Sequence, residues 1–175
     1  MTSTRPFHMN DLFSFNNVNL DVLTETFNMS FYLQYMSRWP ELFTAAVAPD
    51  GSISGYMLGK SEGIGELWHG HVSAVTVAPL YRRLGLAKML MEDLESTSAN
   101  VYNAYFVDLF VRASNRLAIS MYEQFGYIQY RRVLGYYSGD DPEDALDMRK
   151  ALPRDKNKQS VIPLDKPVLP EDLEW

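Results

Sequence analysis

Cysteine is absent from the 175-residue sequence. The chain therefore has no disulfide framework, and no thiolate is available as a nucleophile or a metal ligand. Only three histidines are present, and because their spacing does not match that of a structural zinc site we expect no metal centre. No apolar run is long enough to cross a bilayer, so we expect no membrane contact.

Positive charge is also scarce. The chain has 16 Lys and Arg against 22 Asp and Glu, a net charge of −6, which argues against a nucleic-acid partner. Its beginning, Met1–Pro6, lacks the apolar core of a signal peptide. We therefore expect a soluble, cytoplasmic protein. Hydrophobic residues make up 46% of the chain, which is sufficient for a packed core, and the length suits one folded domain.

The most informative segment is Val75–Glu92, which is predicted to end a strand, turn, and open a helix. The first N–H groups of a helix lack partners and the helix dipole is positive there, so such a turn can bind an anion. Gly85 lets a phosphate approach the backbone closely, and Arg82 and Arg83 offer forked donors. The alternative is an ordinary basic turn, because neither a Walker loop nor a dinucleotide-binding pattern is present.

Apolar patterning and turn residues predict a mixed sheet with helices on its faces, an α/β (α+β) fold with about seven strands and about four helices. We expect Asn10 and Ser30 to cap the first two helices. The strands are expected at residues 5–9, 42–48, 53–60, 68–77, 105–112, 127–136 and 144–150, and the helices at 11–16, 31–39, 86–96 and 115–125.

The composition changes after residue 152, because four of the nine prolines fall in the last 23 residues. Residues 1–152 are therefore predicted to form the folded domain, and residues 153–175 an extended, proline-rich arm. The arm carries too many apolar side chains for a solvated linker. It is expected to lie on this domain or on a partner, and a disordered tail is the alternative.

A second segment, Val111–Tyr127, predicts a strand followed by an Asn115-capped helix that ends in Phe-Gly-Tyr. Together with Arg82-x-x-Gly85-x-Ala87 it resembles the signatures of the GCN5-related N-acetyltransferase (GNAT) superfamily. Longer phrases are similar to the catalytic subunits of NatB-type N-terminal acetyltransferases. These phrases are Leu12–Asp21, Phe31–Tyr35, Trp68–Val72, Phe106–Arg112 and Asp147–Leu152.

The resemblance implies a GNAT fold and acetyl-CoA as the acetyl donor. It implies acetylation of the α-amine of nascent proteins beginning Met-Asp, Met-Glu, Met-Asn or Met-Gln. It also implies a heterodimer with a large helical-repeat auxiliary subunit, which brings the enzyme to the ribosome. The residues implied to bind the cofactor are Val75, Val77, Arg82, Arg83, Leu84, Gly85, Leu86, Ala87, Asn115 and Tyr122.

An α-amine has a reference pKa of about 7.7–8.0, against about 10.4 for lysine, so a free N-terminus needs no strong base near neutral pH. His71 and Ser73 lie two apart on a predicted strand and share a face with Val75, ahead of the cofactor turn. His71 could accept a proton through water or bind an acidic second residue of the substrate. A hydrogen-bonded core histidine is the alternative. His69 shares this face but lies further from the turn.

Asn115 and Tyr122 are seven residues apart and so lie on one face of their helix. The resemblance makes Tyr122 the general acid, and a reference pKa near 10 suits donation to a departing thiolate. The alternative is a core tyrosine. Glu25 could hold the substrate ammonium or order a water, or it could be a solvated loop residue.

Phe110 is expected to line a methionine pocket, and the resemblance makes Tyr136 and Tyr137 a clamp on the peptide backbone. Phe27 and Ser73 stand where the family is expected to have tyrosine and threonine, in the substrate-binding region. Two other functions stay open at this point. One is acetylation of lysine side chains or small amines, and the other is a non-catalytic, acetyl-CoA-binding partner subunit.

Overall fold

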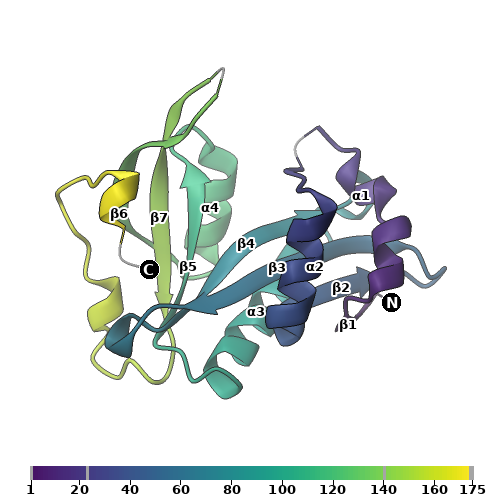
Figure 1. Cartoon of the computed structure of the whole chain (residues 1–175), viewed down its shortest axis with the longest axis horizontal. Helices are drawn as coiled ribbons and strands as arrows, with labels where there is room; N and C mark the ends of the chain where they lie inside the picture. Colours follow the sequence, from purple (N-terminus) through teal and green to yellow (C-terminus); the bar gives the residue numbers. More distant parts are fainter. Residues whose placement is uncertain (1, 23, 140, 174–175) are drawn as a thin grey trace. The chain divides into compact units, whose positions relative to one another are not determined.

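The computed structural model describes residues 2–22, 24–139 and 141–173. It contains two compact units: Met1–Lys60 with Val72–Thr97, and Ser61–His71 with Ser98–Trp175. Strands β3 and β4 run through both units, and the strands are hydrogen-bonded in the order β1-β2-β3-β4-β5-β7-β6 (Figure 1). In the described residues the predicted mixed sheet of seven strands and four α-helices is confirmed. None of the described helices has the length and hydrophobicity needed to span a bilayer.

The elements have the following bounds. The strands are β1 (Ser3–Pro6), β2 (Phe43–Val47), β3 (Ile53–Glu62), β4 (His69–Val77), β5 (Phe106–Arg112), β6 (Ile128–Tyr137) and β7 (Glu143–Ala151), and the helices are α1 (Asn16–Asn19), α2 (Met29–Arg38), α3 (Leu86–Asn100) and α4 (Arg116–Gln124).

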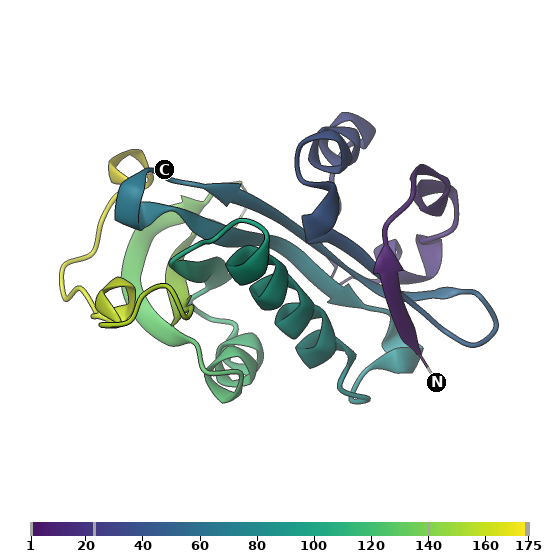
Figure 2. The same cartoon turned by 90° about the horizontal axis from the view of Figure 1, so that it is seen from below.

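In the first unit, successive residues of β2 point to opposite faces of the sheet. Phe43 packs beside Tyr32 of α2, with ring centroids 6.4 Å apart. The next residue, Thr44, donates a hydrogen bond of 2.8 Å to Asp93 of α3. Helices α2 and α3 therefore cover opposite faces of this part of the sheet (Figure 2).

The helix predicted at residues 11–16 with Asn10 as its cap is wrong. The structure has a 3-10 turn at Met9–Phe13, followed by the one-turn helix α1. The Asp11 carboxylate accepts a 2.7 Å hydrogen bond from the backbone N–H of His8 and forms a two-pronged ion pair with Arg5 at 2.7 and 2.8 Å. Such local side-chain bonds compete with regular helix formation.

Helix α2 begins at Met29, and its cap is Asn28 rather than the predicted Ser30. The Asn28 side chain accepts a 2.9 Å hydrogen bond from the backbone N–H of Phe31, which satisfies one of the unpaired donors of the first turn. Tyr32 and Tyr35 on this helix are buried, with 2% and 6% exposure. The aromatic residues of α2 therefore build the core of the first unit.

In the second unit, β5 and β6 each pair antiparallel with β7. The C-terminal arm lies along β6, where Val168 forms a parallel bridge with Val133 and accepts a 2.9 Å hydrogen bond from Leu134 N–H. Leu173 is buried in a small cluster with Val133 and Ala145. The arm therefore covers an edge strand of this chain, and the disordered-tail alternative is wrong for residues 153–173. Residues 174 and 175 of the predicted arm lie outside the described residues, and the domain boundary at residue 152 stays a prediction.

Candidate functional site

The turn between β4 and α3 has the backbone geometry of an anion site. Gly85 adopts a φ of +81°, a conformation that disfavours side chains, and a Cβ there would meet open space. Helix α3 then runs for 15 residues, and its first turn follows Gly85 directly. The first N–H groups of this helix have no partners within the helix itself. Donors that point from a helix N-terminus beside an open glycine can hold a phosphate.

Arg82 is placed differently from Arg83. The Arg82 guanidinium forms a close ion pair with Asp21, and its Nε donates a 3.1 Å hydrogen bond to the Val77 carbonyl oxygen. Arg83 is exposed and has a φ of +65°. Arg82 therefore fixes the start of the turn, and of the two predicted phosphate donors Arg83 is the exposed one.

Strand β4 carries the predicted cofactor residues Val75 and Val77, which are half-buried. Ser73, predicted to bind substrate, shares a 2.7 Å hydrogen bond with the Tyr35 hydroxyl of α2. Thr76 shares a 2.8 Å hydrogen bond with Thr24 in the loop before α2. The Ser73 hydroxyl thus links β4 to α2 through a hydrogen bond.

Glu25 follows Thr24 in that loop and is exposed, as a group that meets substrate must be. Phe27 stacks on Phe31 with ring centroids 4.3 Å apart and an interplanar angle of 14°. The backbone N–H of Phe27 donates a 3.2 Å hydrogen bond to the Tyr32 hydroxyl. Aromatic packing on α2 therefore sets the path of the loop that carries Glu25.

In the second unit, side chains from β4 and β5 interleave. His69 stacks on Phe106 at 4.7 Å, and His71 lies 5.5 Å from Phe110, both between ring centroids. Asp108, between the two phenylalanines on β5, has Oδ1 2.7 Å from His71 Nδ1 and 3.5 Å from His69 Nε2. The predicted site residue His71 is thus buried with a carboxylate partner.

Close packing explains why the residue between His69 and His71 is a glycine, Gly70. A Cβ at this position would lie 2.3 Å from Ser98 Oγ at the end of α3 and 3.4 Å from a Val107 methyl group. The opposite faces of a strand alternate, so the side of β4 that bears Gly70 packs closely against its neighbours. The other side presents His69 and His71 to Asp108.

Asp108 carries the main electrostatic feature of the second unit. Burial acts to raise its pKa, but His69, His71 and Arg149 together outweigh burial and lower the pKa to about 2. Arg149 also donates hydrogen bonds of 3.3 and 3.2 Å to the buried carboxylate of Asp147. Burial and the nearby Asp108 raise the pKa of Asp147. Asp108 is therefore a carboxylate at neutral pH.

The predicted peptide-binding residues form a row of rings beyond His71. Phe110 lies 4.7 Å from Tyr136, and Tyr136 lies 5.2 Å from Tyr137, between ring centroids. The Tyr137 hydroxyl donates a 3.3 Å hydrogen bond to the Phe110 carbonyl oxygen. The register of β6 against β7 shifts between Val133 and Tyr137, and such irregularities redirect side chains near functional sites. The structure thus brings four of the predicted substrate residues together.

Asn115 and Tyr122 occupy the predicted positions on α4. The Asn115 side chain caps the helix by accepting a 3.1 Å hydrogen bond from Ala118 N–H. Tyr122 is buried, and burial raises its pKa to about 12. Its ring packs 6.4 Å from Phe125 and 6.0 Å from Tyr127. The phenol is therefore protonated throughout the range of neutral pH.

One group of side chains in the second unit has the composition of a possible metal site. Ligand atoms of Glu62, His69 and His71 lie within 4.8 Å of one another. Two histidines two apart on a strand share a face, and the absence of a metal centre stays a prediction. The roles of all the predicted site residues stay proposals.

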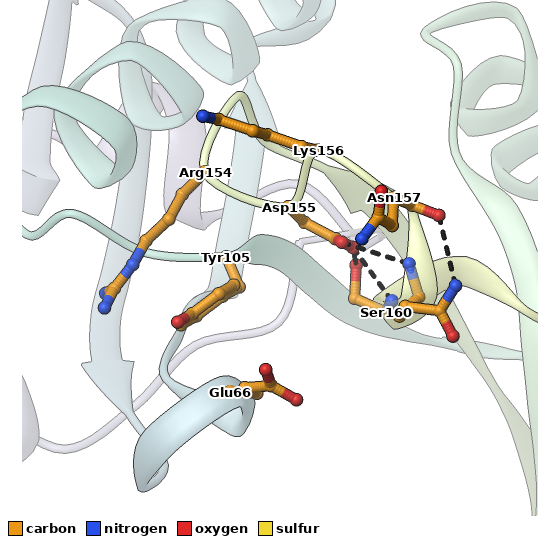
Figure 3. A pocket seen from close by; sticks show the side chains of 8 residues that line it. Glu66, Tyr105, Arg154, Asp155, Lys156, Asn157 and Ser160 are labelled. Atoms are coloured by element: carbon orange, nitrogen blue, oxygen red, sulfur yellow. Dashed lines mark hydrogen bonds between the residues drawn. The ribbon is translucent and has the colours of Figure 1, made fainter.

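A hollow of about 230 Å³ also lies in the second unit. Figure 3 shows its lining, in which the Asp155 side chain points toward Ser160, while Arg154 and Tyr105 lie on the other side of Asp155. The Asp155 carboxylate accepts hydrogen bonds of 3.0 and 2.8 Å from the backbone N–H groups of Gln159 and Ser160. Asp155 is thus used to close the arm's own turn, and none of the predicted site residues lines this hollow.

Sequence reasoning missed the Asp108 partner of His71. From the sequence, Asp108 and Arg149 stand out only as members of the similar phrases Phe106–Arg112 and Asp147–Leu152. The available signal was two alternating sets, His69-x-His71 and Phe106-x-Asp108-x-Phe110, each placing its members on one face of a strand.

Residues 10–127 match the family model of the acetyltransferase (GNAT) family. The chain belongs to this family, and the matched segment contains the turn before α3 and the His71, Asp108 and Tyr122 positions.

Within the family, the chain is similar over its full length to catalytic subunits of N-terminal acetyltransferase B. It is 62% identical over 175 residues to the N-terminal acetyltransferase B complex catalytic subunit NAA20 of Arabidopsis thaliana, covering 100% of this chain and 99% of the relative. It superposes with a TM-score of 0.87 and 41% identity on Chaetomium thermophilum Naa20 in complex with a bisubstrate analogue, covering 97% of both chains. It superposes with a TM-score of 0.86 and 46% identity on the NatB acetyltransferase complex bound to a bisubstrate inhibitor, covering 99% of both chains. The chain is thus an N-terminal acetyltransferase of the NatB catalytic-subunit type.

Proposed function

We propose that this chain transfers the acetyl group of acetyl-CoA to the α-amine of proteins that begin Met-Asp, Met-Glu, Met-Asn or Met-Gln. It does so in the cytosol as the catalytic subunit of a complex with a large helical-repeat auxiliary subunit. That subunit positions it on chains emerging from the ribosome. The observation that carries the activity is the start of α3, where the first N–H groups of a 15-residue helix follow a glycine at φ +81°.

The residues of the first unit fit the diphosphate of coenzyme A. The N–H groups of residues 83–88 and the exposed Arg83 would hold it, and the absence of a Cβ at Gly85 leaves room for it. Arg82, paired with Asp21 and the Val77 carbonyl, keeps the turn in shape. Acetyl-CoA supplies an activated thioester, and the protein's own part is to bind and orient it.

The second unit supplies groups suited to the amine and the peptide. An α-amine with a pKa of about 7.7–8.0 is roughly one-tenth neutral at pH 7. His71, whose Nδ1 faces Asp108, presents Nε2 as the acceptor for a proton or a hydrogen bond from the substrate. Phe110, Tyr136 and Tyr137 form the aromatic row on which the first residue would lie. This arrangement favours a free chain end over a lysine side chain.

Tyr122 stabilises the departing thiolate by donating a hydrogen bond. Its pKa of about 12 exceeds that of an ordinary thiol, about 8.5, so the proton remains mainly on the phenol. We propose this hydrogen-bond donation as the form that the general-acid role of Tyr122, predicted from the resemblance, takes in this chain. A neutral, buried phenol provides this without a change of charge.

A panel of peptides tests the reaction and its selectivity. Full-length chain, co-expressed with the auxiliary subunit, is incubated with acetyl-CoA and peptides beginning Met-Asp, Met-Glu, Met-Asn or Met-Gln. Matched controls begin Met-Lys, or carry a blocked N-terminus and an internal lysine. We expect turnover of the first four only. Modification of the blocked peptide alone would instead establish a lysine acetyltransferase, and failure to bind acetyl-CoA in calorimetry would establish a non-catalytic subunit.

The first unit also offers a surface for the auxiliary subunit. We name it the N-terminal apolar surface, and it consists of exposed side chains before and on α2: Met9, Phe13, Leu20, Val22, Met29 and Leu33. Four of these side chains are at least 60% exposed, whereas large apolar groups are normally buried. Tyr32 and Tyr35 of α2 pack inward and are not part of this surface.

Co-purification tests this surface. Phe13→Asp combined with Leu20→Asp should reduce recovery of the auxiliary subunit by at least about tenfold, since buried apolar anchors dominate interface energies. Ile64→Asp, an equally exposed position at 82% in the second unit, serves as the matched control. Equal recovery with both variants would refute the assignment.

A further inference from the structure

The end of β6 is bulged just before the two tyrosines of the aromatic row. Residues 134–136 of β6 lie opposite a single residue of β7, Asp144. The Asp144 carboxylate accepts hydrogen bonds of 2.8 Å from Gly135 N–H and 2.7 Å from Arg132 Nε. A bulge redirects the side chains that follow it, so Asp144 holds the backbone that sets the direction of both tyrosine rings.

The neighbouring carboxylate, Glu143, is bonded to the turn between β5 and α4. Its Oε1 accepts a 2.5 Å hydrogen bond from Ser114 N–H, and its Oε2 lies 3.4 Å from Arg112 Nη1. Beside them, Ala113 N–H donates a 3.0 Å hydrogen bond to the carbonyl oxygen of Asp144. The hydrogen bond with Ser114 and, to a smaller extent, the pairing with Arg112 lower the pKa of Glu143. Glu143 is therefore a carboxylate at neutral pH, and its bond to a backbone N–H is of the strong, charge-assisted kind.

Arg112 extends this link to the aromatic row. Its guanidinium carbon lies 4.3 Å from the centroid of the Tyr137 ring, a distance at which a cation and an aromatic face attract each other. Its Nη1 also donates a 3.5 Å hydrogen bond to the carbonyl oxygen of Asp141, in the loop between β6 and β7. Glu143 thus holds a side chain that lies directly over one of the tyrosines.

The turn before α4 is held by hydrogen bonds of its own. Asn115 N–H donates a 2.9 Å bond to the Arg112 carbonyl oxygen, and Arg116 N–H donates a 2.8 Å bond to the Ser114 carbonyl oxygen. The Asn115 side chain caps the helix itself. Because none of these bonds uses Glu143, loss of its carboxylate should release the end of the β6–β7 hairpin and leave the start of α4 in place.

We propose that Glu143 and Asp144 are positioning residues for the peptide site. Asp144 holds the bulge that precedes Tyr136 and Tyr137, and Glu143 ties that end of the hairpin to the turn before α4 through Ser114 N–H. Their role rests on the proposed function, in which the aromatic row binds the first residue of the peptide. Neither carboxylate contacts the substrate in this arrangement, and both act through the tyrosine rings.

Peptide kinetics separates such positioning from a general loss of structure. In the complex with the auxiliary subunit, Glu143→Ala should raise the KM for a Met-Asp peptide at least about tenfold, the effect of one lost charge-assisted hydrogen bond. It should leave kcat and the affinity for acetyl-CoA within about twofold, because only binding of the peptide is weakened. Glu143→Gln should recover most of the loss, because its amide oxygen can still accept from Ser114 N–H. Glu171→Ala, at an exposed acidic residue of the arm, is the matched control and should leave KM unchanged.

A Tyr137→Leu background tests whether Glu143 acts through the aromatic row. There, Glu143→Ala should raise KM by no more than about a further twofold, because the ring that it positions is gone. A rise of equal size in both backgrounds would show a merely structural role. An unchanged KM for Glu143→Ala in the wild-type background would also refute the assignment.

Asp144→Ala tests the bulge in the same assay. Gly135 N–H then loses its acceptor, so the KM for the peptide should rise at least about fivefold. Asp144→Asn keeps an acceptor oxygen and should stay closer to the wild type. An unchanged KM for Asp144→Ala would show that the bulge keeps its shape without the carboxylate, which would contradict the role given to Asp144.

NMR of the full-length chain reads the link without the reaction. A 2.5 Å hydrogen bond to a carboxylate should move the Ser114 amide proton downfield and slow its exchange with solvent. Glu143→Ala should remove both features and shift the ring signals of Tyr137, because Arg112 loses its carboxylate partner. Tyr137 signals that stay in place would overturn the proposal. If the wild-type complex acetylates no peptide, the proposed function fails, and these signals still decide whether Glu143 holds the hairpin.

Discussion

Replacing Tyr122 with phenylalanine isolates the role of its hydroxyl. The ring packs against Phe125 and Tyr127, and phenylalanine keeps these contacts. The contacts described for the Tyr122 side chain are those of its ring, so the substitution should change the free energy of unfolding by less than about 1 kcal/mol.

The size of the kinetic loss follows from the pKa of Tyr122. At about 12, the phenol donates a hydrogen bond to a developing thiolate without giving up its proton. A hydrogen bond to a charged group contributes about 1.5–3 kcal/mol. At about 1.36 kcal/mol per tenfold change in rate, Tyr122→Phe should lower kcat by about 10- to 150-fold. Full proton transfer would instead allow losses up to about 10⁴-fold.

The assay compares kcat for a Met-Asp peptide with the affinity for acetyl-CoA measured by calorimetry. Tyr105→Phe is the matched control, because Tyr105 lines the hollow beside the arm and none of the predicted site residues does so. We expect kcat to fall and the affinity to stay within about twofold. Unchanged turnover, or an equal loss in turnover and affinity, would refute the proposed role of the hydroxyl.

Three further predictions concern stability. Gly70→Ala should lower the free energy of unfolding, measured by urea denaturation, by about 1–3 kcal/mol, because its Cβ would lie 2.3 Å from Ser98 Oγ. Adding Ser98→Ala should recover part of this lost stability. If the destabilising effects of the two substitutions were simply additive, the proposed clash would be contradicted. Asp108 has a folded-state pKa of about 2, against about 3.9 for an ordinary aspartate, so its contribution to stability is present above about pH 4 and is lost as the pH falls toward 2. Asp108→Asn should flatten this part of the acid-denaturation curve, and an unchanged slope would argue against the lowered pKa. Leu173→Ala should lower the free energy of unfolding by about 2 kcal/mol, the low end for a buried leucine, because Leu173 is 7% exposed in a small cluster. An unchanged melting temperature would show that the arm does not pack in solution.

The elements with strong local patterns could be predicted from the sequence. The apolar strand that became β5 and the asparagine-capped α4 were located to within one residue at each end. The same holds for the turn before α3, where Gly85 and the start of the helix lie where the sequence predicts them. These features depend on neighbouring residues only.

Features that depend on contacts between distant residues could not be predicted in this way. The pairing of Asp108 with His71 joins residues 37 positions apart, and no periodicity reveals which strands become neighbours. The ion pair between Arg82 and Asp21 likewise joins residues 61 positions apart. At the N-terminus, Asp11 favoured a short turn because of its bonds to His8 and Arg5, which a helix-propensity argument does not weigh.

The central claim is that this chain acetylates the free α-amine at a chain end. The most direct test uses one peptide that begins Met-Asp, has a free N-terminus and contains an internal lysine, with acetyl-CoA and the full-length chain in its complex. Tandem mass spectrometry then locates the acetyl group. We predict acetylation of the α-amine with the lysine unmodified, and acetyl groups on the lysine with the α-amine left free would contradict the claim.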